Sequence, residues 1–336
     1  MTSFNSVSDL ARSYQLRMSQ SALRSKLNTL TAEVSSGVKQ DISKSLRGDL
    51  SHITQVENRL ALLTTYGQNI AEAQSLLEAV QNAMANIQSI AASVGTHLLS
   101  DALVSSEATL DIYLKKSPAD LHAALGALNT SVGGRFVFSG AASDTPAVGT
   151  GAEMIAQLSA AVADAEDITS ITDAISGYFD APVGAGGFAD FYLGRSGEST
   201  SIAVSGEHSV PLDYTALSES FKSTLKGLAI LSYTSDRTDL SYDTRRELAR
   251  TAGELLVSGE TALTSAMTIV GSRQESVEKA LNRNHEEITK FLSIKNSMNS
   301  SDPYESAIAL QEIEANIETL YAVTARLSKL SIVEYL

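Results

Sequence analysis

Apolar side chains recur at intervals of three and four residues at both ends of the chain. Near the N-terminus they are Leu16, Leu23, Leu27, Leu30 and Val34. Near the C-terminus they are Leu310, Ile313, Ile317, Leu320 and Leu327. This spacing places the apolar groups on one face of each predicted helix. A lone helix cannot bury such a face, so we expect the two ends to pair. We favour burial of these faces between subunits over burial within one chain.

Longer helical patterns lie inside these ends. One runs from residue 51 to 94 and the other from about 238 to 298. At about 1.5 Å per residue the first would span roughly 65 Å, which is typical of a rod. We also expect a first helix over about 6–35, ended by Gly37, and a final helix that begins at Pro303 after an Asp302 or Ser301 N-cap. Ser117-Pro118 predicts a break between two further helices.

The middle of the chain favours loops and strands. Twelve of the 21 glycines lie between residues 133 and 206, and short β-prone runs surround them. The strand predictions fall at 135–139, 192–193, 201–204 and 209–212. We therefore predict a mainly α fold with a small β-containing insertion. Its parts are paired terminal helices (1–40 plus 300–336), an elongated rod of long helices (50–134 plus 238–299) and an antiparallel β-rich outer domain at the tip (135–237).

Composition narrows the function classes. The formal net charge of −14 argues against nucleic acid and against anionic membrane surfaces. The absence of cysteine excludes disulfides, thiolate metal sites and a cysteine nucleophile. The chain has no apolar run of 18 residues, so no membrane insertion is expected. Residues 1–10 lack the pattern of a cleaved Sec-type signal peptide.

Candidate catalytic and ligand motifs are weak. The glycine run 184–187 lacks the Gly-Lys-Ser/Thr of a phosphate loop, so a flexible surface loop is favoured. His285-Glu286-Glu287 lacks a second histidine four residues later, and Ser-x-x-Lys occurs three times without a partner motif. The five histidines are scattered along the chain. We therefore predict no catalytic residues, no cofactor, no metal and no enzymatic activity.

Three segments carry a resemblance to known proteins. Residues 33–38 (EVSSGV) resemble the segment that ends the first helix in the flagellin superfamily of bacterial flagellar axial proteins, although residues 40–45 depart from the run that often follows. Residues 133–140 (GGRFVFSG), followed by Asp144-Thr145-Pro146, are similar to the hook-associated protein 3 family of hook–filament junction proteins. Residues 191–194 resemble a further stretch of that family. The motif residues are Gly134, Arg135, Phe136, Phe138 and Gly140.

The resemblance implies a structural subunit of the bacterial flagellum, needed for motility, that joins hook-associated proteins to the filament through polymerising coiled-coil terminal helices. It implies extracellular assembly after type III export without a cleaved signal. The implied partners are further copies of the chain, another hook-associated junction protein, flagellin and an export chaperone. Two other functions stay open: a flagellin filament subunit, and a secreted helical translocator or signalling rod.

Overall fold

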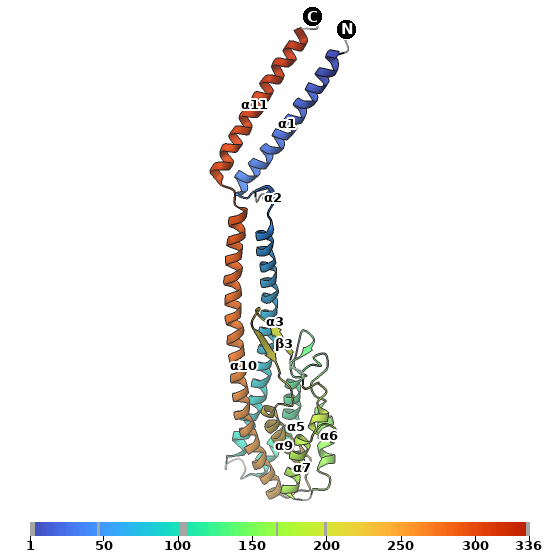
Figure 1. Cartoon of the computed structure of the whole chain (residues 1–336). Helices are drawn as coiled ribbons and strands as arrows, with labels where there is room; N and C mark the ends of the chain where they lie inside the picture. Colours follow the sequence, from blue (N-terminus) through green and yellow to red (C-terminus); the bar gives the residue numbers. More distant parts are fainter. Residues whose placement is uncertain (1–3, 46–47, 101–105, 166, 198–199, 334–336) are drawn as a thin grey trace. The chain divides into compact units, whose positions relative to one another are not determined.

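The structure is a computed structural model that describes residues 4–45, 48–100, 106–165, 167–197 and 200–333 of the 336-residue chain. In the first helix it describes side chains from residue 11 onward, and in the last helix up to residue 326. The fold is mainly helical with a small antiparallel β part, as predicted (Figure 1). The chain forms two compact units. We call residues 1–62 with 286–336 the terminal unit and residues 63–285 the central unit, and we describe each by itself.

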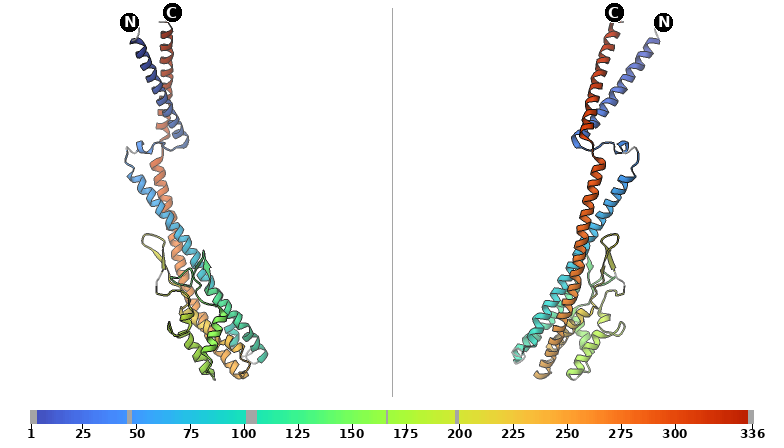
Figure 2. Two further views of the ribbon diagram at one scale, coloured as in Figure 1. Left: turned by 90° about the vertical axis from the view of Figure 1, so that its right-hand side faces the viewer. Right: turned by 60° about the vertical axis from the view of Figure 1, so that its left-hand side comes forward.

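The terminal unit is built around two long helices from the opposite ends of the sequence. Helix α1 (Phe4–Ser36) and helix α11 (Pro303–Val333) pack side by side, and the two chain termini lie at the same end of the pair (Figures 1 and 2). The pair is therefore antiparallel. The unit also contains the short helix α2 (Ile42–Ser45), the first residues of α3 (Ser51–Leu98) and the last residues of α10 (Tyr242–Asn299).

Local signals end α1 and start α11 where the sequence predicts. Gly37 takes φ 69°, a left-handed conformation that glycine adopts without a Cβ clash, and its N–H donates to Glu33 O at 2.8 Å. Asp302 Oδ1 accepts the N–H of Tyr304 at 2.8 Å, and Pro303 occupies the first helical position.

The central unit contains the rest of α3 and α10 and the elements between them. Its helices are α5 (Glu107–Leu128), α6 (Gly151–Ala161), α7 (Ile168–Asp180), α8 (Phe188–Phe191) and α9 (Glu219–Ser235). Strands β1 (Ser131–Val132) and β2 (Arg135–Phe136) form one antiparallel pair. Strands β3 (Thr200–Ala203) and β4 (Ser209–Leu212) form a second, in which Ile202 is opposite Val210.

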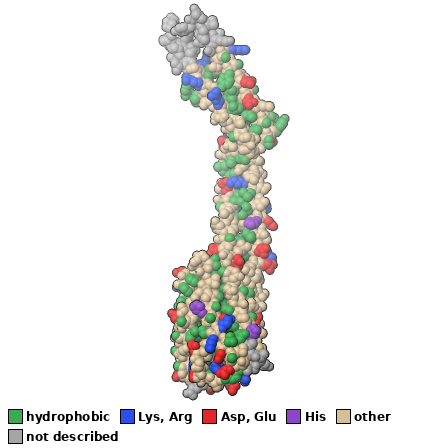
Figure 3. Space-filling model, turned by 180° about the vertical axis from the view of Figure 1, so that it is seen from behind, with side chains coloured by type: hydrophobic (Ala, Val, Ile, Leu, Met, Phe, Trp, Pro, Cys, Tyr) green, Lys and Arg blue, Asp and Glu red, His purple; other side chains and the backbone are tan. Residues whose placement is uncertain are grey.

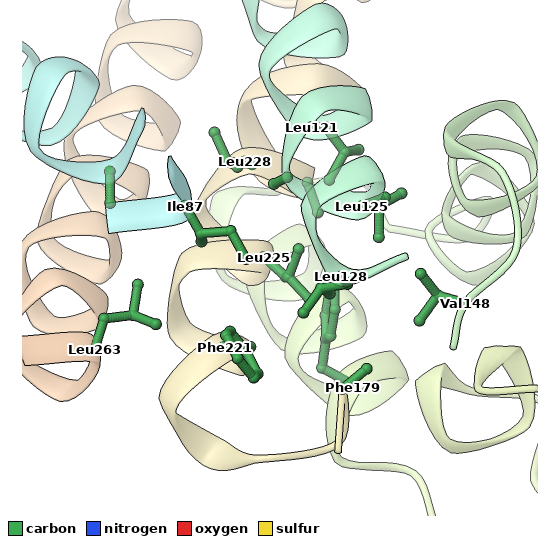
Figure 4. Packing of buried hydrophobic residues seen from close by; sticks show 14 of the residues in the cluster. Ile87, Leu121, Leu125, Leu128, Val148, Phe179, Phe221, Leu225, Leu228 and Leu263 are labelled. Atoms are coloured by element: carbon green, nitrogen blue, oxygen red, sulfur yellow. The ribbon is translucent and has the colours of Figure 1, made fainter. Parts of the chain in front are cut away.

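One hydrophobic core joins the helices of the central unit. Figure 4 shows Ile87 of α3, Leu125 of α5, Phe179 of α7, Leu228 of α9 and Leu263 of α10 converging on it. All of these side chains are buried. The 3-4 spacing of apolar residues on each helix supplies one stripe to this core, which is why a chain with 43% hydrophobic residues closes around it.

The predicted break at Ser117-Pro118 is wrong. Helix α5 continues through Pro118, which cannot donate a backbone hydrogen bond to the carbonyl of Leu114 four residues earlier. The hydroxyl of the preceding residue, Ser117, donates to Leu114 O at 2.7 Å in a buried position. This side-chain bond satisfies the carbonyl that Pro118 leaves without a helical donor, so the helix is not forced to end there.

The β part is smaller than predicted. Only Arg135 and Phe136 of the predicted strand 135–139 form a strand, and Tyr192 makes a single bridge to Val148. The residues before Tyr192 form the helical turn α8, in which Phe188 and Phe191 are buried, with the Phe188 ring 5.1 Å from that of Phe179. Packing of these rings favours the turn over an extended strand. Most of the described secondary structure between residues 135 and 237 is accordingly helical.

Candidate functional site

The terminal stripes meet along the α1–α11 pair, but the pair covers them incompletely. Leu30 and Ile313 are buried. Val34 is exposed, and the side chain of Leu327 lies outside the described residues. The remaining stripe residues are half-buried: Leu16, Leu23, Leu27, Leu310, Ile317 and Leu320. The structure thus brings the two predicted stripes together within one chain and leaves much of their apolar surface in contact with solvent.

Three polar side chains fix the alignment of the two helices. Arg24 Nη2 donates to the hydroxyl of Tyr321 at 2.8 Å, and Gln20 Nε2 donates to the same hydroxyl at 3.2 Å. The hydrogen bond from Arg24 lowers the pKa of the Tyr321 hydroxyl, and the bond from Gln20 adds to this effect. The register of the pair is set by these partners, which lie about 300 residues apart in sequence and were missed by pattern reasoning.

Backbone hydrogen bonds close the base of the pair. Val38 and Ser300 form an antiparallel bridge, Lys39 N donates to Asn299 O at 2.9 Å, and Ser301 N donates to Gly37 O at 2.9 Å. These bonds tie the segment after α1 to the segment before α11. Helix α1 therefore ends and helix α11 begins at one small junction. The spacing of residues in the sequence does not predict this junction.

A second set of apolar side chains lies on the outer faces of the pair. Tyr14 and Met18 of α1 are 62% and 56% exposed, and Tyr304 and Ile308 of α11 are 78% and 49% exposed. At 100° per residue both sets lie roughly 180° from the stripe of their own helix. Sequence reasoning missed them, although each pair has the i, i+4 spacing that marks one helix face.

The family-like motif is a structural element of the central unit. Arg135 pairs with Glu72 of α3, which attaches β2 to the long helix. Phe138 is fully buried and contacts Phe221 edge-on with ring centroids 5.2 Å apart, whereas Phe136 is half-buried. These contacts connect the insertion to α3 and α9.

Two glycines of this motif are required by the backbone. Gly134 and Gly140 adopt φ values of 81° and 62°, which are unfavourable for residues with a Cβ. A Cβ at position 140 would also lie 2.2 Å from Arg195 O, in the bridge that connects these two residues. The spacing of glycine and aromatic residues in the motif thus reflects turns and packing.

The glycine run 184–187 is held by hydrogen bonds to a nearby carboxylate. The carboxylate of Asp190 accepts the N–H groups of Gly184 at 2.7 Å and Gly186 at 2.6 Å. These backbone bonds, that of Gly184 first, hold the pKa of Asp190 below its ordinary value of 3.8. The loop is therefore held by hydrogen bonds, and the donors that a phosphate would need are already used.

Other chemistry has little support in the described part of the chain. No group of three or more His, Asp or Glu side chains there could hold a metal ion. None of the described helices combines the length and the apolar character needed to cross a membrane.

Several chains among the solved structures have a similar fold. The chain is similar to a solved structure from Vibrio parahaemolyticus, described as a candidate flagellar hook-associated protein, with a TM-score of 0.49 and 14% identity. The likeness covers 73% of this chain and 95% of that one. No family model matches the chain, and no curated protein matches it. What the chain does must therefore be inferred from its own residues.

Proposed function

We propose that this protein is a non-enzymatic structural subunit of the bacterial flagellum that acts at the hook–filament junction and assembles through its terminal helices. The observation that carries the proposal is the α1–α11 pair, whose apolar stripes are only partly covered within one chain. Each Leu or Ile that is fully withdrawn from water contributes about 1.5–3 kcal/mol. Six half-buried stripe residues thus leave a substantial driving force for association.

The distribution of charge supports assembly through the terminal unit. That unit has 12 basic and 13 acidic residues, a net charge of −1, whereas the central unit has 13 basic and 26 acidic residues, a net charge of −13. A nearly neutral surface can be crowded among copies without strong repulsion. The acidic central unit resists close association and favours a place in contact with solvent.

The junction role rests on the motif at residues 133–140, which resembles the hook-associated protein 3 family. In this chain the motif attaches the insertion to α3 and α9, so it defines the architecture of the central unit. The proposed partners follow from that resemblance: another hook-associated protein, flagellin and an export chaperone. The proposed location is extracellular, after type III export.

Two substitutions test the assembly surface. Replacing Leu23 or Leu320 by Asp puts a charge on a half-buried stripe position, where burial against a neighbour would desolvate it. We expect the Leu23→Asp and Leu320→Asp variants to keep the thermal unfolding of the central unit and to lose incorporation into flagella. Normal incorporation of either variant would contradict the proposal.

A seeding experiment separates a junction protein from a flagellin. Purified protein is added to hook or filament fragments and the products are viewed by electron microscopy. Self-limited rings or short caps are expected for a junction subunit, and long filaments would instead identify a flagellin. Gold labelling of the protein on hook-bearing cells should place it between hook and filament, and labelling elsewhere would refute the junction role.

A further inference from the structure

The charges of the terminal helices are segregated. Residues 12–26 of α1 contain four basic residues and no acidic one: Arg12, Arg17, Arg24 and Lys26. Residues 305–318 of α11 contain four acidic residues and no basic one: Glu305, Glu312, Glu314 and Glu318. All eight side chains are exposed.

These opposite charges do not meet inside one chain. Tyr321 lies opposite Arg24 in the antiparallel pair, so the acidic residues 305–318 lie nearer the base and the basic residues 12–17 nearer the free end. No ion pair joins α1 and α11 among their described residues. Figure 3 shows the same trend on one face, with Lys and Arg side chains beside the grey residues and Asp and Glu side chains farther along.

Each charged region contains or borders one of the exposed apolar pairs. Tyr14 and Met18 lie within the basic stretch of α1, and Tyr304 and Ile308 lie at the start of α11 beside Glu305 and Glu312. The basic rim of the first patch is Arg17, since Arg12 lies on the stripe side of the helix and Arg24 is bonded to Tyr321. The acidic rim of the second patch is Glu305 with Glu312. Such surfaces complement each other, whereas either surface placed against its own copy would bring like charges together.

We propose that the terminal pair binds a second copy of this chain head to tail, with the Tyr14–Met18 patch of one copy seated on the Tyr304–Ile308 patch of the next. The inference rests on the proposed function and adds a second contact to it, on the helix faces opposite the stripes. The contact is heterologous, since two different patches meet, and it leaves a free patch at each end for further copies. From the Arg24–Tyr321 register, the centres of the two patches are offset by about 23 residues of helix, roughly 35 Å along the pair.

Single cysteines test the contact directly because the natural chain has none. The Met18→Cys and Ile308→Cys variants are prepared with different affinity tags, mixed under assembling conditions and oxidised. A disulfide between the two variants is expected on non-reducing gels, with little product from either variant alone. Homodimers of the Met18→Cys variant would indicate a symmetric contact, and assembled material without cross-links would indicate that something else covers the patches; either result overturns the inference.

Charge reversal tests the role of the rims. The Arg17→Glu variant has two acidic rims, and the Glu305→Lys/Glu312→Lys variant has two basic rims. We expect each alone to raise the critical concentration for assembly roughly tenfold at low salt. An equimolar mixture should restore assembly, because each variant supplies the rim that the other lacks. Wild-type assembly should weaken as salt is raised.

A matched control separates rim charge from net charge. The Glu78→Lys/Asp173→Lys variant changes the net charge by the same amount as Glu305→Lys/Glu312→Lys but alters exposed residues of the central unit. It should assemble at the wild-type concentration. If the wild type itself does not assemble, the proposed function fails. If the wild type assembles and both rim variants match it, only the head-to-tail contact is refuted.

Discussion

The same substitution at two isoleucines of α11 should affect two different properties, the stability of the terminal pair at one position and the binding of another copy at the other. Ile313 lies in the stripe of α11 and is 4% exposed, whereas Ile308 lies on its outer face and is 49% exposed. Replacing either by Ala removes three carbon atoms from the same type of side chain. The two variants therefore separate the stability of the terminal pair from its ability to bind another copy.

The expected magnitudes follow from burial. Truncating a buried Ile to Ala costs about 2–5 kcal/mol, so Ile313→Ala should lower the stability of the α1–α11 pair by about this amount. Ile308→Ala should change monomer stability by less than about 0.5 kcal/mol. If assembly covers the exposed half of Ile308, the loss at about 0.8 kcal/mol per CH₂ is about 1 kcal/mol, which weakens each contact roughly fivefold.

Two assays read these effects separately. Trypsin cleavage after the exposed residues Arg24 and Lys26 reports opening of the terminal pair in the monomer, and sedimentation across a dilution series reports the critical concentration. Ile313→Ala should accelerate cleavage, while Ile308→Ala should leave cleavage unchanged and raise the critical concentration. Equal cleavage rates for the two variants, or an unchanged critical concentration for Ile308→Ala, would refute the reasoning.

Three further predictions concern the central unit. Phe138→Ala should destabilise it by about 3–5 kcal/mol in thermal unfolding because the ring is fully buried, and the half-buried Phe136→Ala should cost clearly less; equal losses would contradict the packing role of the motif. A Cβ at Gly259 would lie 2.2 Å from a threonine hydroxyl of α9, so Gly259→Ala should destabilise the unit. A Cβ at Gly271 in the same helix meets no atom within 4 Å, so Gly271→Ala should stabilise the unit by about 1 kcal/mol. A stabilised Gly259→Ala variant would show that the helices are less closely packed. The pKa of the Asp190 carboxylate is lowered in the folded protein, so its hydrogen bonds hold the loop at any pH above the ordinary pKa of 3.8 and are lost as the pH falls through the lower folded-state pKa. An NMR titration of the loop amides, compared with an Asp190→Asn variant, checks this. Loop amide shifts that are equal in both proteins and independent of pH would contradict it.

Helices could be predicted because their apolar spacing is local. The stripe through Leu23 and Leu30, and that through Ile313, need only a few turns of sequence to be recognised. The continuation of helix α5 through Pro118 could not be predicted, because it depends on whether the Ser117 hydroxyl donates to Leu114 O. The predicted strand at 192–193 was overestimated because Tyr192 favours strands by propensity, but here it follows the helical turn α8 and makes a single bridge to Val148.

The candidate site was predictable only in part. The stripes were found because each is a periodic pattern, but their alignment depends on a contact between Arg24 and Tyr321 that joins opposite ends of the chain. The outer patches were missed because each has only two apolar residues on its helix face, which is too few to form a recognisable periodic pattern. Their meaning emerges only when the antiparallel register places the basic and acidic stretches at different positions along the pair.

Hydrogen exchange measured on the monomer and on the assembled protein tests most directly whether copies associate through the terminal helices. The account predicts that amides of residues 4–36 and 303–333 exchange much more slowly after assembly, while those in the core of the central unit, such as Leu125 and Leu228, keep the same rates. Unchanged exchange in both terminal helices of the assembled protein, with new protection confined to the central unit, would contradict it.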